Sequence, residues 1–202
     1  MRLSEANPLA LGSASPRRRD LLELGGVPFV VRPSPADETP MRGEVPTDYL
    51  ERVARAKLEA ARAGSLSPCA GWLVADTIVV APEGGILGKP SDPEEARALI
   101  ERLAGRTHQV MTRFLLAEPD RGAQPAHAQT VVTRVTLRPI TASEARRYAA
   151  TGEGRDKAGG YAAQGKASAF IERIDGSYTN VVGLPLSEVL VALRGLGWLD
   201  DS

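Results

Sequence analysis

Residues 8–19 read PLALGSASPRRR, and within them a predicted strand gives way to a predicted helix. The apolar run at residues 8–12 is typical of a short buried strand. Ser15 is a suitable N-cap residue, and Pro16 is favoured at the first helical position. The leucines that follow give the helix an apolar side, and Gly25 ends it. The stretch therefore predicts a strand–turn–helix unit, the building block of an α/β protein.

The same alternation continues along the chain. Further strands are expected at residues 29–32, 72–81, 109–117, 128–139, 170–174 and 178–182. Further helices are expected at residues 47–63 (ended by Gly64), 92–104, 141–152 and 185–193, with capping boxes at Asp92/Glu95 and Thr141/Glu144. A turn is expected near residues 122–127, and Asp175-Gly176 is a hairpin signal between the last two strands. The pattern predicts an α/β fold with a mixed sheet flanked by helices.

Composition narrows the class of protein. The 202 residues suffice for one domain, and the 25 Lys and Arg residues equal the 25 Asp and Glu residues. Such a neutral chain without a basic stripe is not expected to bind nucleic acid. Cys69 is the only cysteine, which suits a reducing cytoplasm. No apolar stretch approaches the length of a membrane span, and no signal peptide is expected.

The helix start at residues 13–19 is the first candidate site. Two serines precede three consecutive arginines, which are unfavourable in a helix's first turn. A phosphate would remove this conflict, because free backbone amides and arginine side chains both bind phosphate oxygens. The alternative is a capped helix whose arginines are solvated.

Lys57 and Asp76 are the second pair of candidates. Lys57 lies at helical spacing from Val53 and Ala61, so it is expected on or beside the inward side of its helix. It either extends to solvent along that surface or points its charge into a cleft. Asp76 is the one charge in the apolar run 72–80, WLVADTIVV. Because burying an unpaired carboxylate is costly, Asp76 either forms a structural hydrogen bond or orients water or a metal.

Lys89 is a third candidate, within Gly88-Lys89-Pro90. Pro90 restricts the backbone and Gly88 allows close approach, so that Lys89 can point at a phosphate. The surrounding sequence is not a Walker motif, and no cysteine or histidine spacing indicates a metal site. His108 and His127 are isolated and are expected to be structural or exposed.

Together these stretches resemble the Maf family of nucleoside triphosphate pyrophosphatases over nearly the whole chain. The matching segments, in order, are SASPRR (13–18), DE (37–38), AK (56–57), ADT (75–77), GKP (88–90), GRTH (105–108), DKAG (156–159), QG (164–165) and NVVGLPL (180–186).

The resemblance implies one elongated α/β domain over residues 1–202, with two lobes and a central cleft. It implies hydrolysis of a nucleoside triphosphate to a monophosphate and diphosphate, assisted by Mg²⁺ or Mn²⁺. Carried over to matching positions, Asp76 is the proton acceptor that activates water, and Glu38 assists it with metal or water. The residues implied to hold the triphosphate are Ser13, Arg18, Lys57 and Lys89.

The resemblance also implies a substrate. Arg17, Thr77 and Gln164 match the branch that acts on dTTP and UTP, whereas the branch acting on 7-methyl-GTP has other residues at these positions. Two alternatives remain: hydrolysis of 7-methyl-GTP or another modified nucleotide, and a non-enzymatic role in septum formation. A homodimer is plausible from the resemblance. Arg113 departs from the family pattern, and it either contacts phosphate or turns outward; the loop 152–155 is a second departure.

Overall fold

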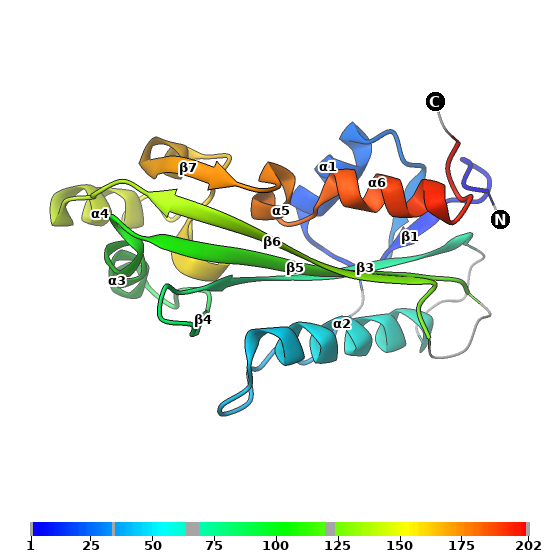
Figure 1. Ribbon diagram of the computed structural model, residues 1–202, viewed down its shortest axis with the longest axis horizontal. Helices are drawn as coiled ribbons and strands as arrows, with labels where there is room; N and C mark the ends of the chain where they lie inside the picture. Colours follow the sequence, from blue (N-terminus) through cyan, green and yellow to red (C-terminus); the bar gives the residue numbers. More distant parts are fainter. Residues whose placement is uncertain (1, 34, 64–68, 120–123, 201–202) are drawn as a thin grey trace. The chain divides into compact units, whose positions relative to one another are not determined.

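The computed structural model describes residues 2–33, 35–63, 69–119 and 124–200, and the seven strands among them form one mixed sheet (Figure 1). The strands are β1 (Leu9–Leu11), β2 (Phe29–Val31), β3 (Gly71–Val80), β4 (Ile86–Leu87), β5 (Thr107–Ala117), β6 (His127–Leu137) and β7 (Ile171–Asp175). Their order is β2-β1-β3-β5-β6-β7, and β4 pairs with β3 outside this path. β1 pairs in parallel with β2 and β3, whereas β3–β4 and β6–β7 are antiparallel.

The helices alternate with the strands in the first half of the chain. The α-helices are α1 (Pro16–Leu24), α2 (Pro46–Ala63), α3 (Pro93–Leu103), α4 (Ala142–Ala149), α5 (Tyr178–Val182) and α6 (Leu186–Gly195). Two 3-10 helices, η1 (Ala158–Gly160) and η2 (Lys166–Phe170), lie between α4 and β7. The expected α/β class, with a mixed sheet flanked by helices, is confirmed.

The chain divides into two compact units. Unit 1 contains residues 1–76, 112–130 and 183–202, and unit 2 contains residues 77–111 and 131–182. The long strands β3, β5 and β6 therefore each contribute residues to both units. The expected arrangement of one domain, with two lobes and a central cleft, stays a prediction.

In unit 1, helices cover both faces of the sheet. Figure 1 shows α2 on one face and α1 with α6 on the other. The apolar side of α2, including Ala54 and Leu58, packs on Trp72, Val74 and Leu115 of β3 and β5. Since this packing buries only one side of α2, every inward position of this helix faces the sheet. The packing therefore decides where Lys57 lies.

In unit 2, one apolar core joins the strands to α3 and α4. It contains Val79, Val110 and Val135 from three strands, Ile100 from α3 and Tyr148 from α4. Tyr161 and Ala163, which precede Gln164, belong to the same core. The segment carrying Gln164 is thus attached to the interior of unit 2.

The segment 178–182 differs from its prediction, because it forms α5 and not the second strand of a hairpin. The Ser177 hydroxyl accepts a hydrogen bond from the Asn180 amide at 3.3 Å, which favours a helical turn. The buried Asn180 side chain donates to the Val110 carbonyl at 3.0 Å and to the Thr133 hydroxyl at 3.0 Å. A paired strand at 178–182 would compete with both interactions.

The cap predictions have mixed outcomes. The reciprocal capping box of Thr141 and Glu144 is confirmed. Asp92 caps α3, but the Glu95 carboxylate accepts from the Ser91 amide at 2.7 Å instead of from the Asp92 amide. Ser15 occupies the N-cap position of α1 and Pro16 begins the helix, as predicted, but the Ser15 side chain makes no capping hydrogen bond. The predicted helix end at Gly64 and the start of the predicted turn at 122–127 lie outside the described residues.

Candidate active site

Ser13 lies between the end of β1 and the start of α1, and its side chain is buried. Its hydroxyl accepts a hydrogen bond from the Ser15 amide at 3.2 Å and another from Arg18 Nη1 at 3.1 Å. The serine that organises this helix start is therefore Ser13 and not Ser15. The interaction aligns the first turn of α1 with the guanidinium of Arg18.

Arg18 is the buried member of the three arginines, whereas Arg17 is half-buried and Arg19 is exposed. Its Nε donates to the Gly183 carbonyl at 2.9 Å, which ties α1 to the segment before α6. Burial lowers the pKa of Arg18, and the negative charges of Asp76 and Glu38 oppose that shift. The expected cation at this helix start is thus held inside unit 1.

Lys57 and Asp76 form a buried ion pair in which each side chain is less than a tenth exposed. Lys57 Nζ lies 2.5 Å from Asp76 Oδ1 and 2.7 Å from Glu38 Oε1. The side chains of Lys57 and Asp76 are 7% and 8% exposed, whereas that of Glu38 is 42% exposed. The isolated acid of β3 is therefore paired, and the lysine of α2 points inward.

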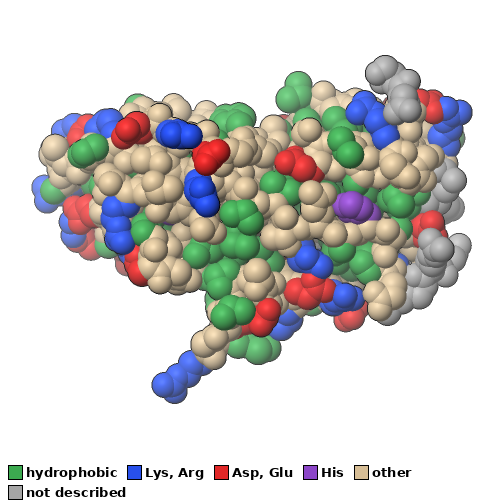
Figure 2. Space-filling model, viewed as in Figure 1, with side chains coloured by type: hydrophobic (Ala, Val, Ile, Leu, Met, Phe, Trp, Pro, Cys, Tyr) green, Lys and Arg blue, Asp and Glu red, His purple; other side chains and the backbone are tan. Residues whose placement is uncertain are grey.

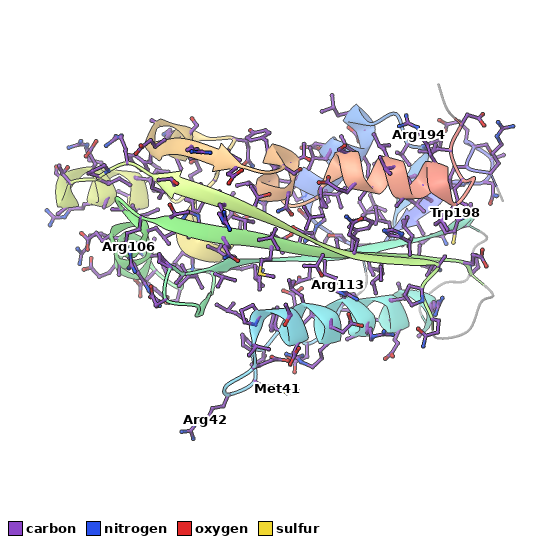
Figure 3. The ribbon with its side chains drawn as sticks, in the orientation of Figure 1. Met41, Arg42, Arg106, Arg113, Arg194 and Trp198 are labelled. Carbon is purple, nitrogen blue, oxygen red and sulfur yellow. The ribbon has the colours of Figure 1, made fainter. Side chains whose placement is uncertain are left out.

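The loop that carries Glu38 is anchored to α2. The Tyr49 hydroxyl donates to the Glu38 carbonyl at 2.9 Å, and Arg52 Nη2 donates to the Thr39 carbonyl at 3.0 Å. Burial, reinforced by the charges of Asp76 and Glu38, raises the pKa of Tyr49, so its hydroxyl remains protonated. Figure 3 shows Arg42 at the outer end of this loop, pointing away from α2.

Sequence reasoning missed Tyr49, although a signal for it was present. Tyr49, Val53 and Lys57 recur at four-residue spacing on α2, so they share its inward side. A tyrosine on such a stripe needs a partner for its hydroxyl, and here that partner is the backbone of Glu38.

Thr77, Lys89 and Gln164 belong to unit 2, whereas Ser13, Arg18, Glu38, Lys57 and Asp76 belong to unit 1. Thr77 follows Asp76 on β3 and is half-buried, whereas Lys89 and Gln164 are exposed. The carbonyl of Gly88, beside Lys89, accepts from the Gly159 amide at 3.1 Å. Their roles in binding nucleotide remain predictions.

The Arg113 side chain contacts both α2 and β6. It forms an ion pair with Glu51 of α2, and its Nη1 donates to the Thr130 hydroxyl at 3.0 Å. Figure 3 shows Arg113 on the side of β5 that faces α2. These contacts assign Arg113 a structural role between strand and helix.

The two histidines have the structural character expected of them. His108 is buried, and its Nε2 lies 2.7 Å from the Tyr161 hydroxyl. Burial lowers the pKa of His108 to about 4, so the ring is neutral near pH 7. His127 is half-buried and stacks on Phe114.

Metal ligands are few in the part of the chain that the structure describes. Among the described residues, no three His, Cys, Asp or Glu side chains lie close enough together to hold a metal ion by themselves. Glu38 and Asp76 nevertheless converge on one ammonium group. One or two carboxylates are what Mg²⁺ requires when substrate phosphates supply further oxygens. The donor set therefore fits a metal that arrives with a phosphorylated ligand.

Charges elsewhere on the surface are mixed. On the face in Figure 2, Lys and Arg side chains are interspersed with Asp and Glu side chains.

None of the described helices is long and apolar enough to cross a membrane.

Fold and site together define an α/β protein with a buried lysine–carboxylate pair and a buried arginine at a helix start. Residues 8–196 match the family described as Maf-like protein, and the chain belongs to this family.

Relatives with curated names are similar over almost the whole chain. The protein named dTTP/UTP pyrophosphatase from Syntrophus aciditrophicus (strain SB) is 47% identical over 194 residues, which cover 96% of this chain and 92% of that protein. The protein of the same name from Geobacter sp. (strain M21) is 44% identical over 193 residues, covering 96% and 97%. A solved structure titled nucleoside-triphosphatase / dITP/XTP pyrophosphatase, from Mycobacterium abscessus, aligns with a TM-score of 0.41 and 15% identity, covering 94% of this chain and 95% of that chain.

Proposed function

We propose that this protein is a nucleoside triphosphate pyrophosphatase that hydrolyses dTTP and UTP to the monophosphate and diphosphate. The observation that carries the proposal is the buried Lys57–Asp76 pair, 2.5 Å apart and close to Arg18. The names of the relatives from Syntrophus and Geobacter supply the substrate.

In this proposal Asp76 accepts the proton of the water that attacks the α-phosphorus. Lys57 donates a charge-assisted hydrogen bond to this carboxylate at 2.5 Å and so holds it in place. In the same proposal, the residues that hold the triphosphate are Ser13, Arg18, Lys57 and Lys89. Positive charges held at fixed positions stabilise the charge that develops on the leaving diphosphate.

The charge balance of the site supports a divalent cation. Arg18 and Lys57 carry two positive charges, and Glu38 and Asp76 carry two negative charges, so the group cannot neutralise a triphosphate by itself. We propose that Glu38 and Asp76 hold Mg²⁺ or Mn²⁺, which would supply electrostatic stabilisation of the phosphates.

Recognition of the nucleobase is assigned to Arg17 and to two residues of unit 2. We propose that Arg17, Thr77 and Gln164 favour thymine and uracil over larger bases by shape and hydrogen bonding. We further propose a cytoplasmic protein, supported by its single cysteine, with nucleotides and not nucleic acids as partners. A homodimer remains a prediction.

A substrate panel tests the proposal. The protein is incubated with dTTP, UTP, CTP and 7-methyl-GTP, with Mg²⁺, Mn²⁺ or chelator, and both diphosphate and orthophosphate are measured. We expect diphosphate from dTTP and UTP, and no turnover with chelator. Orthophosphate release would point to a different scission site, and preferred turnover of 7-methyl-GTP would favour the other branch. No turnover of any nucleotide would favour a non-enzymatic role.

Two variants test the assignment of Asp76. Asp76→Asn keeps the side chain's shape but cannot accept the proton from water, so we expect hydrolysis to be abolished with the fold intact. Glu59→Gln, an equivalent change at an exposed position of α2, serves as the matched control and should retain activity. Normal dTTP turnover by Asp76→Asn would show that the role given to Asp76 is wrong.

A further inference from the structure

The turn that carries Gln164 is hydrogen-bonded to the carboxylate of Glu153. The Lys166 amide donates to Glu153 Oε1 at 2.9 Å, and the Ala167 amide donates to Glu153 Oε2 at 3.3 Å. Both oxygens of one side chain thus bind successive backbone amides just after Gln164. Nothing in the proposed mechanism uses Glu153.

Gly165 and Glu153 fit against each other closely. A Cβ atom at position 165 would lie 2.3 Å from Glu153 Oε1, far inside van der Waals contact. The carboxylate therefore lies directly against the Cα of the residue that follows Gln164. A side chain at position 165 would therefore displace the Glu153 carboxylate from its present position, although the φ of −110° is open to residues other than glycine.

The other side of the turn is held through Tyr148. The Ala162 amide donates to the buried Tyr148 hydroxyl at 3.0 Å, and that hydroxyl also hydrogen-bonds Glu153. Burial favours the neutral form of Glu153, but the hydrogen bonds from Lys166, Tyr148 and Ala167 outweigh this effect and lower its pKa. Glu153 is therefore ionised. Its carboxylate binds the backbone after Gln164 directly, and it is linked to the backbone before Gln164 through the Tyr148 hydroxyl.

We propose that Glu153 is a positioning residue that fixes the turn of Gln164 and thereby determines the choice between uracil and cytosine bases. The inference rests on the proposed function, in which Gln164 contacts the base.

The reason lies in the chemistry of the glutamine amide, which carries both a donor and an acceptor. Uracil presents the O4 acceptor beside the N3–H donor, whereas cytosine presents the N4 donor beside the N3 acceptor. A glutamine that is free to turn its amide over pairs with either base. A fixed backbone at Gln164 restricts the directions from which its amide can approach the base, so that one of the two pairings is favoured. The hydrogen bonds from Lys166 and Ala167 to Glu153 hold that backbone.

The test measures kcat and KM for UTP and CTP in Glu153→Gln, whose side-chain amide replaces one acceptor oxygen with a donor. We expect KM for UTP to rise about tenfold with kcat nearly unchanged, and the UTP/CTP ratio of kcat/KM to fall by a similar factor. If Glu153 acted instead on the phosphates that react, Glu153→Gln would lower kcat.

A double-mutant cycle separates positioning from general loss of structure. Gly165→Ala should displace the carboxylate and lower the UTP/CTP ratio in the wild-type background. It should have little further effect in the Glu153→Ala background, because the clashing side chain is then absent. Amide exchange at Lys166 and Ala167 should be faster in Glu153→Gln than in the wild type.

Glu144→Gln is the matched control, since the Glu144 carboxylate also accepts a backbone amide, that of Thr141 at 2.8 Å, at the start of α4. The Glu144→Gln protein should be less stable than the wild type but should keep the same UTP/CTP ratio of kcat/KM. Wild-type turnover of UTP with an unchanged ratio in Glu153→Gln would overturn this inference alone. A wild-type protein that does not hydrolyse UTP would overturn the proposed function together with the inference.

Discussion

Replacing Lys57 with methionine removes the cation of the buried ion pair while keeping the length of the side chain. The Asp76 carboxylate would then remain in β3 with 8% of its surface exposed and without its partner at 2.5 Å. Breaking a buried pair by removing one member costs about 3–5 kcal/mol. The nearby charge of Arg18 offsets part of this loss. We therefore expect the lower end, about 3 kcal/mol, or about two orders of magnitude in the folding equilibrium constant.

The loss of stability caused by Lys57→Met should depend on the presence of Asp76. Asp76→Leu leaves Lys57 with Glu38 as a partner at 2.7 Å, so this single change should destabilise the protein less. The double variant Lys57→Met/Asp76→Leu contains no uncompensated buried charge. Because buried pairs are often replaced by apolar residues at little loss, the double variant should recover most of the stability lost in Lys57→Met.

Urea unfolding near neutral pH, followed by tryptophan fluorescence, measures the four free energies of unfolding. Diphosphate release from dTTP, measured in parallel, should be absent in all three variants. A Lys57→Met protein as stable as the wild type, or strictly additive effects in the double variant, would show that the pair is not coupled as the distances imply.

Three further predictions follow from separate contacts. Tyr49→Phe removes the hydrogen bond to the Glu38 carbonyl, so we expect a loss of about 1 kcal/mol in urea unfolding and a lower kcat for dTTP; an unchanged kcat would argue that the loop does not need this anchor. The pKa of His108 is about 4 in the folded state against about 6.5 when unfolded, so only the unfolded state gains this proton as the pH falls between these values. Stability should therefore decline over that range by about 3 kcal/mol from this residue, and a His108→Gln protein with the same decline would contradict the assignment. Gly71→Ala would place a Cβ 2.6 Å from the Trp198 ring, so a loss of about 2 kcal/mol in thermal or urea unfolding is expected, and wild-type stability would show that the ring moves aside freely.

Local patterns predicted most of the fold. Alternating apolar runs and helix caps located the strands and α1 to α4, because these signals act over a few residues. The error at 178–182 arose because a turn signal at Asp175-Gly176 is compatible with either a hairpin or a capped helix. The side chain of Asn180 decides between them through contacts with distant strands. Contacts between residues far apart in the sequence cannot be predicted from local periodicity.

The candidate site was predictable in part for the same reason. The inward position of Lys57 follows from helical spacing, and the need of Asp76 for a partner follows from the apolar run around it. That these two residues partner each other, and that Glu38 joins them, required the fold. The position of Glu38 came from family resemblance alone, since it lies in a loop without periodicity. Glu153 was missed, because its role depends on backbone amides at positions 166 and 167.

The hydrogen bond from Arg18 to the Gly183 carbonyl spans 165 positions of the chain. During synthesis, α1 leaves the ribosome long before the segment that satisfies its arginine. The nascent chain must therefore keep this helix start incomplete until Gly183 has been translated. A polypeptide truncated before Gly183 would retain Ser13, Lys57 and Asp76 yet lack the carbonyl that holds Arg18 in place. Maturation of the proposed catalytic group thus depends on synthesis of the segment that contains Gly183.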